Sequence, residues 1–175
     1  YNSFSVYLLA KAYEVTGDAR YRDGAVTKAL VGVIPGQLTD GPNAGRWLDP
    51  HNARPAYHYI MLRSLAALAK TLPTDDPDRP AIVNALAEGL RARNPDFAAK
   101  GAPNKDKALE ALILAQEVFA ADPDFLRDTA LDTALDALGR LVSHEARRGA
   151  IPLSPREWAM FLAFAVQRPA ENRFD

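Results

Sequence analysis

Cysteine is absent from this chain of 175 residues. The absence excludes disulfide bonds, a cysteine nucleophile and thiolate metal ligands. It leaves the cellular compartment open, because both a reducing cytosol and an export route without disulfides are compatible with it. The sequence therefore assigns no localisation.

Net charge is almost lacking as well, since 21 basic and 22 acidic residues leave a formal charge of -1. Proteins that bind nucleic acid or anionic membranes usually carry a basic excess. Long hydrophobic runs are missing too: the longest strongly apolar stretch, residues 158–166, is far shorter than the roughly 20 residues that span a bilayer. We therefore expect neither a nucleic-acid partner nor a membrane partner.

The chain also lacks the common catalytic motifs. It has no glycine-rich phosphate loop, no G-x-S-x-G nucleophile elbow and no kinase signature. Its three histidines, at positions 51, 58 and 144, do not have the H-E-x-x-H spacing of a zinc site. We expect no metal and no cofactor.

What the chain does have is helical spacing of its apolar residues. At 48% hydrophobic and 25% charged residues it is typical of a globular protein. Gly17, Asp18, Asp122 with Pro123, and a capping box at 154–157 mark helix ends. These features predict a single all-α domain over residues 1–175. The predicted helices cover about 3–16, 56–72, 80–93, 106–120 and 122–145, and two further helices begin at 18 and at 154.

The predicted helices fall into two kinds. The first, third, fifth and last are apolar on nearly every side, whereas the second, fourth and sixth carry charge on all but one face. A helix that is apolar all round must be surrounded by protein. We therefore predict consecutive antiparallel hairpins in which the odd-numbered helices form an inner layer and the even-numbered helices an outer layer.

The segment LAKAYEVTGDARYRDGA at 9–25, together with this alternation, resembles the α/α-toroid superfamily. That superfamily includes six-hairpin glycosidases, polysaccharide lyases, sugar epimerases and terpenoid cyclases. Its rings usually close with more hairpins than the three seen here. The resemblance implies a partial toroid of about seven helices, and we expect the chain to be the C-terminal part of a larger one.

The segment GRWLDPHNARPAYHY at 45–59 is the candidate site. Short hairpin turns place all long links at one end of the helices, and in the toroid enzymes that this chain resembles the cleft lies where inner helices begin. Trp47 is suited to stacking on a sugar, with further substrate contacts from His51, Asn52 and Arg54. The candidate catalytic residues are Asp49, Tyr57 and His58.

Two chemistries remain open at this segment. Glycoside hydrolysis needs a pair of carboxylates, Asp49 and a second from Asp40, Glu145 or Glu157. Lyase or epimerase chemistry needs a group such as Arg54 to neutralise a uronate, and a Tyr or His base. Structural roles are equally open: Trp47 and Asp49 can close the core and cap a turn, one of Tyr57 and Tyr59 belongs to the core, and His58 can face either way.

The leading hypothesis is a carbohydrate-processing domain, hydrolase, lyase or epimerase-like, acting on an oligo- or polysaccharide, including acidic ones. The alternative is a non-catalytic helical domain that binds a partner or braces a larger protein. Apolar surface at the ends of the predicted arc permits self-association or contact with an upstream domain. The residue types do not name the substrate or the linkage.

Overall fold

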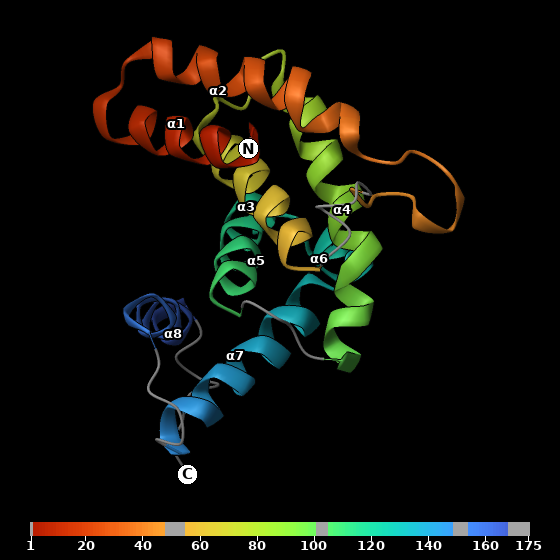
Figure 1. Ribbon diagram of the computed structural model, residues 1–175, viewed down its shortest axis with the longest axis vertical. Coiled ribbons are helices and arrows are strands. Elements are labelled where there is room, and N and C mark those ends of the chain that lie inside the picture. Colours follow the sequence, from red (N-terminus) through yellow and green to blue (C-terminus); the bar gives the residue numbers. More distant parts are fainter. Residues whose placement is uncertain (1, 48–54, 101–104, 149–153, 168–175) are drawn as a thin grey trace.

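The computed structural model describes residues 2–47, 55–100, 105–148 and 154–167, and Figure 1 shows their arrangement. Within these residues the chain is all-helical. The two 3-10 turns are η1 (Ile34–Gly36) and η2 (Gly41–Asn43), and an isolated bridge pairs Gln37 with Trp47. The α-helices are α1 (Asn2–Thr16), α2 (Ala19–Gly32), α3 (Pro55–Thr71), α4 (Arg79–Lys100), α5 (Lys105–Phe119), α6 (Pro123–Asp128), α7 (Leu131–Arg148) and α8 (Pro155–Gln167). None of these described helices combines the length and the apolar character needed to cross a membrane.

Local capping confirms the predicted helix starts at Asp18 and at Ser154. The Asp18 carboxylate accepts a hydrogen bond from the Arg20 backbone N–H at the start of α2. At α8 the predicted capping box is complete: the Ser154 N–H donates to Glu157 Oε2, and the Glu157 N–H donates to Ser154 Oγ. These side chains satisfy N–H groups that a helix start leaves without intrahelical partners.

Helix α4 differs from the sequence prediction, because it runs through Pro95 instead of ending near Arg93. A proline inside a helix removes a hydrogen bond and normally ends the helix. Here the preceding turn is anchored by Asn94, which is fully buried. Its side chain accepts from the Tyr59 hydroxyl and donates to the Thr129 carbonyl, so tertiary contacts offset the local penalty.

The single helix predicted over 122–145 is also wrong, since it divides into α6 and α7. Ala130 adopts a left-handed conformation with φ of 51°, which interrupts the helix. The Thr129 carbonyl accepts from Asn94 Nδ2 of α4 rather than continuing a helical ladder. The break therefore depends on a contact with a residue 35 positions away.

The helices form two rows (Figure 1). In the first row α1 packs on α3, α3 on α5, and α5 on α8. The second row consists of α2, α4 and α7, which pack on α1, α3 and α5 respectively. We call the side of the first row that faces away from the second row the open face.

The prediction that the first, third, fifth and last predicted helices are surrounded by protein holds for the third and fifth, α3 and α5. It is wrong for the first and the last, which are α1 and α8. Every residue of the 62–69 stretch in α3 and the 111–115 stretch in α5 is buried. By contrast, α1 leaves Phe4 51% exposed and α8 leaves Val166 81% exposed. The reason is position, because α1 and α8 are the two ends of the first row and each has a described first-row neighbour on one side only.

A close contact between α7 and α8 gives a test of the packing. A Cβ at Gly139 would overlap the ring of Phe164, which is buried. We expect Gly139→Ala to lower the free energy of unfolding by about 1–3 kcal/mol, as overpacked cores do. Urea denaturation measures the change.

Gly24→Ala is the matched control, because a Cβ on this α2 glycine meets only Leu9 Cδ1 at 3.5 Å. Alanine favours helix over glycine, so this change should raise the free energy of unfolding by about 0.5–1 kcal/mol. A Gly139→Ala protein as stable as the Gly24→Ala protein would contradict the α7–α8 contact.

Candidate functional site

The segment 45–59 contributes two of its candidate residues to the core. Trp47 is 3% exposed, and its Nε1–H donates to the Val33 carbonyl at 2.8 Å. His58 is 1% exposed, with Nε2 at 2.9 Å from the Gly89 carbonyl of α4. The Trp47 and His58 ring centroids are 5.3 Å apart. The two side chains thus pack between the 33–47 segment, α3 and α4, on the side of the second row.

Burial also determines the protonation of His58. Desolvation lowers the pKa of His58 to about 3, and the nearby Arg93 and Arg46 charges act in the same direction. The imidazole is therefore neutral near pH 7, and its Nε2–H serves the Gly89 carbonyl. A base of this pKa, enclosed by protein, has little capacity to take a proton from a ligand at neutral pH.

The other candidates of this segment are dispersed. Tyr57 is exposed, whereas Tyr59 is buried and donates its hydroxyl hydrogen bond to Asn94 Oδ1 at 3.2 Å. Of the proposed second carboxylates, Asp40 is exposed at the start of η2 and Glu157 takes part in the α8 capping box. The remaining candidates lie outside the described residues, namely Asp49, His51, Asn52 and Arg54, as does the side chain of Glu145.

A polar cluster that the sequence analysis did not single out lies on the open face. It takes one side chain from each first-row helix, and we call it the Tyr7 cluster: Tyr7 of α1, Arg63 of α3, Glu110 of α5 and Arg156 of α8. The Tyr7 hydroxyl donates to Glu110 Oε1. Arg63 Nη1 donates to Glu110 Oε2 at 2.9 Å, and Arg156 Nη2 donates to the same oxygen. One carboxylate therefore joins four helices.

The members of the Tyr7 cluster differ in burial. The Arg63 side chain is 3% exposed and its guanidinium lies 4.2 Å from the centroid of the Tyr7 ring, a cation–π contact. Arg63 Nε has no hydrogen-bond partner among the described residues. The Arg156 side chain is 42% exposed. Arg63 therefore forms the interior of the cluster, and Arg156 forms its solvent edge.

The Tyr7 phenol is a proton donor in this setting. Burial raises the pKa of Tyr7 to about 12, and the hydrogen bond to the negative Glu110 adds to the shift. The hydroxyl therefore stays protonated throughout the physiological pH range. It can donate a hydrogen bond, but it is not a phenolate base.

A second polar group, the Lys70 cluster, lies further along the same helices and comprises Lys11, Glu14, Lys70 and Glu117. Lys70 Nζ is 2.6 Å from a Glu117 oxygen and 3.8 Å from a Glu14 oxygen. Contact with Lys11 lowers the pKa of Glu14. Lys70 Nζ therefore joins α3 to both α1 and α5.

The two clusters are in register along the helices. Tyr7 and Glu14, Arg63 and Lys70, and Glu110 and Glu117 are each seven residues apart, so each pair lies on one face of its helix. Seven residues correspond to about 10 Å of helix. The open face thus carries two polar tiers about 10 Å apart.

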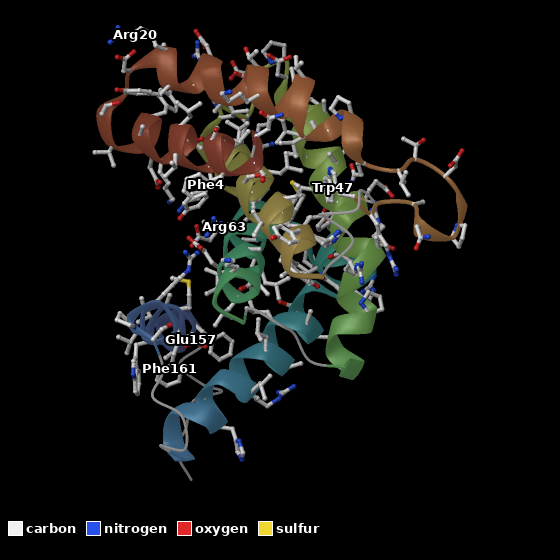
Figure 2. All side chains as sticks on the ribbon, viewed as in Figure 1. Phe4, Arg20, Trp47, Arg63, Glu157 and Phe161 are labelled. Carbon is white, nitrogen blue, oxygen red and sulfur yellow. The ribbon has the colours of Figure 1, made fainter. Side chains whose placement is uncertain are left out.

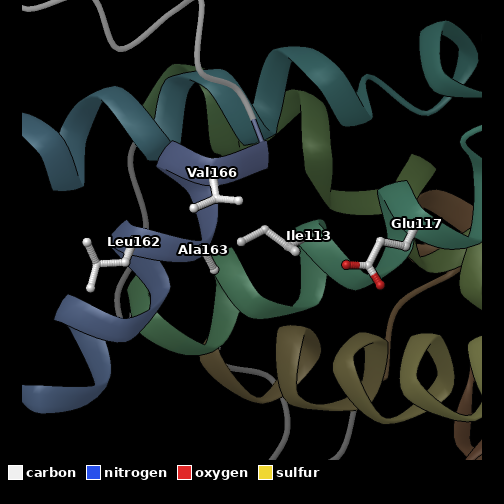
Figure 3. A pocket seen from close by; sticks show the side chains of 5 residues that line it. All are labelled: Ile113, Glu117, Leu162, Ala163 and Val166. Carbon is white, nitrogen blue, oxygen red and sulfur yellow. The ribbon is translucent and has the colours of Figure 1, made fainter.

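An apolar hollow adjoins the second tier between α5 and α8 (Figure 3). It has a volume of about 480 Å³ and is lined by Ile113, Glu117, Leu162, Ala163 and Val166. Glu117 is the charged residue among these lining residues. Figure 2 shows Phe4 and Arg63 on the side of α3 opposite Trp47, so the polar clusters and the buried 45–59 residues lie on different sides of the first row.

The sequence did contain an indication of these clusters. Lys11, Glu14, Arg63 and Lys70 are isolated polar residues on helices that are otherwise apolar. A polar residue on such a helix must find a partner, and a spacing of seven places two of them on one face. Only the tertiary structure shows that Arg63 pairs with Glu110, and Lys70 with Glu117 and Glu14.

Comparison with known proteins adds no family, because no family model, curated protein or solved structure matches the chain. Among the described residues no group of three or more histidines and acidic residues is arranged to hold a metal ion.

The pKa of His58 predicts a pH dependence of stability. The unfolded chain binds a proton at this histidine below pH about 6.5, whereas the folded core excludes it until pH about 3. The free energy of unfolding should therefore fall as the pH is lowered through this interval, by up to about 1.4 kcal/mol per unit from this group. Urea denaturation between pH 7 and 5 measures the slope.

His58→Asn should flatten that slope, because the group that titrates only on unfolding is removed. The same change at the exposed His144 is the control. A His58→Asn protein with the wild-type slope would contradict the buried, neutral state of His58.

Proposed function

We propose that this protein binds and processes an oligo- or polysaccharide on the open face of its first helix row. The observation that carries the proposal is the Tyr7 cluster, to which four helices each contribute a side chain beside an exposed aromatic residue. Phe4 and Tyr7 are three residues apart on α1 and so lie on neighbouring positions of one helix face. An exposed ring beside hydrogen-bonding charged groups suits the apolar face and the hydroxyls of a sugar.

The helix arrangement supports the same proposal. Two rows of alternating helices are the arrangement expected for part of an α/α toroid, whose inner helices would correspond to α1, α3, α5 and α8. Tyr7, Glu110 and Arg156 lie in the first two turns of their helices. This is the end of the inner helices at which the resemblance to toroid enzymes puts the cleft.

The open face also holds carboxylates for catalysis. Glu110 and Glu117 lie two turns, or about 10 Å, apart along α5. Inverting glycoside hydrolases keep their two carboxyl groups about 6.5–9.5 Å apart, so rotation of the Glu117 side chain towards the fixed Glu110 would bring this pair into range. The protonated Tyr7 can supply a further hydrogen bond to a sugar oxygen. Hydrolysis is therefore the reaction that we favour over lyase or epimerase chemistry, which would need a tyrosine or histidine base.

A second candidate function is a non-catalytic domain that docks through its ends. It is favoured by the exposed apolar side chains at both ends of the first row, including Phe4, Leu8, Leu162 and Val166. Side chains of this size on neighbouring positions of α1 and α8 are typical of protein contact surfaces. In this alternative the polar clusters only join the helices.

Binding to a panel of neutral and uronic oligosaccharides, measured by calorimetry, tests the leading proposal. Phe4→Ala should weaken the binding of a saccharide ligand by roughly tenfold, which corresponds to about 1.4 kcal/mol, because a stacking surface is lost. Stability should change little, since the Phe4 side chain is half exposed. Tyr21→Ala, at a partly exposed aromatic on α2 of the second row, is the control and should leave affinity unchanged.

Two results would contradict the proposal. One is the absence of binding to every saccharide of the panel by the wild-type protein. The other is an equal loss of affinity in the Phe4 and Tyr21 variants, because Tyr21 lies on a different helix row.

Sedimentation tests the docking alternative. If the ends of the row bind another copy of the chain, the apparent mass of the wild-type protein should rise with concentration. Leu162→Asp should reduce that rise, because the charge would enter an apolar contact. A concentration-independent monomeric mass would exclude self-docking.

A further inference from the structure

The apolar hollow between α5 and α8 has the size of a small-molecule site. Its volume is about 480 Å³, and ligand sites in proteins typically enclose about 300–1,000 Å³. Its lining comes from the stretch 113–117 of α5 and the stretch 162–166 of α8, about 6 Å along each helix. This is little more than one helical turn, so the hollow fits a compact group better than a docked helix.

The lining of the hollow is aliphatic towards α8. Leu162 and Val166 are both exposed, so they leave apolar surface in contact with water. Figure 3 shows Ile113 of α5 between these side chains and Glu117. An apolar group that enters the hollow removes this surface from water, which is favourable through the hydrophobic effect.

The other edge of the hollow is polar, because Glu117 belongs both to the hollow and to the Lys70 cluster. A Glu117 oxygen is 2.6 Å from Lys70 Nζ, which also lies 3.8 Å from a Glu14 oxygen. The cluster brings two ammonium groups and two carboxylates together. Ammonium donors beside carboxylate acceptors match a hydroxyl group, which both donates and accepts hydrogen bonds. This edge therefore suits the hydroxyl-rich part of a ligand.

A sugar ring is a poor occupant of the hollow itself. Each hydroxyl that is buried needs a hydrogen-bond partner, and burying one without a partner is costly. Four of the five lining residues, Ile113, Leu162, Ala163 and Val166, have aliphatic side chains that offer neither a donor nor an acceptor. The part of a ligand that reaches past Glu117 must therefore be apolar.

We propose that the hollow binds an apolar group, an alkyl chain or an aryl ring, that is attached to a saccharide held on the open face. The sugar hydroxyls lie at the Lys70 cluster, and the apolar group passes Glu117 into the space between α5 and α8. The inference rests on the proposed saccharide function and specifies its substrate class, namely saccharides that carry an apolar substituent.

Calorimetry with alkyl glycosides tests the inference. The probes are methyl, butyl, hexyl and octyl glucosides and galactosides below their micelle concentrations. Octyl glycerol ether is added because it carries the same tail on a head that is not a sugar. We expect the affinity to increase by up to about fourfold for each methylene that enters the hollow, and to level off once the hollow is filled. Octyl glycerol ether should bind more weakly than the octyl glycosides.

Val166→Asn should lower the affinity for the octyl glycosides by about five- to tenfold, because a polar side chain replaces part of the apolar lining. The affinity for the methyl glycosides should stay nearly unchanged. Leu162→Asn, at a second lining residue, should have the same effect. Val31→Asn is the matched control: Val31 is 74% exposed, Val166 is 81% exposed, and each is the next-to-last residue of its helix, but Val31 lies on α2 of the second row. The unfolding curve of each variant verifies that it folds.

The outcomes separate the inference from the proposed function. Octyl glycosides that bind no more tightly than methyl glycosides would overturn the apolar subsite and leave saccharide binding intact. An equal loss of affinity in the Val166 and Val31 variants would overturn the hollow as the place of binding. Octyl glycerol ether that binds as tightly as the octyl glycosides would overturn both proposals, because the sugar would then contribute nothing. A sedimentation mass that rises with concentration, and that octyl glycosides do not lower, would overturn the inference in favour of a second copy as the occupant of the hollow.

Discussion

The Glu110 carboxylate is the interaction on which the first helix row depends. It accepts hydrogen bonds from α1, α3 and α8 while belonging to α5, so it joins the two ends of the row through its centre. The Arg63 side chain is buried, so its ion pair with Glu110 is needed to compensate the charge that folding removes from water. A guanidinium taken out of water without a partner is strongly destabilising, and among the described residues Glu110 is the carboxylate that pairs with Arg63.

The same charges separate the two sides of the first row. On the side of the second row, apolar side chains pack with Trp47, His58 and Asn94, whose polar atoms bond within the core. Towards the open face they present charged tiers, an exposed aromatic ring and the hollow between α5 and α8. A ligand therefore has access to one side of the row, while the other side holds the helices together.

The helix starts predicted from Asp18 and from the Ser154–Glu157 box agree with the structure, because these signals act locally. The failures, at Pro95 and Ala130, both involve Asn94, whose side chain bonds to residues 35 positions away on either side. The candidate site was harder to predict. The segment 45–59 was predicted as a site because aromatic and polar residues are concentrated in it. The residues of the Tyr7 cluster, in contrast, are single positions on four different helices.

The sequence by itself determined an all-helical chain and two kinds of helix, because periodicity and capping act over a few neighbouring residues. It also contained the seven-residue spacing of polar residues on α1, α3 and α5. Only the tertiary structure decided which of those residues meet, which helices end the first row and which side of α3 receives Trp47. Such choices depend on contacts between helices that are far apart along the chain, and no local pattern encodes the partner of a buried charge.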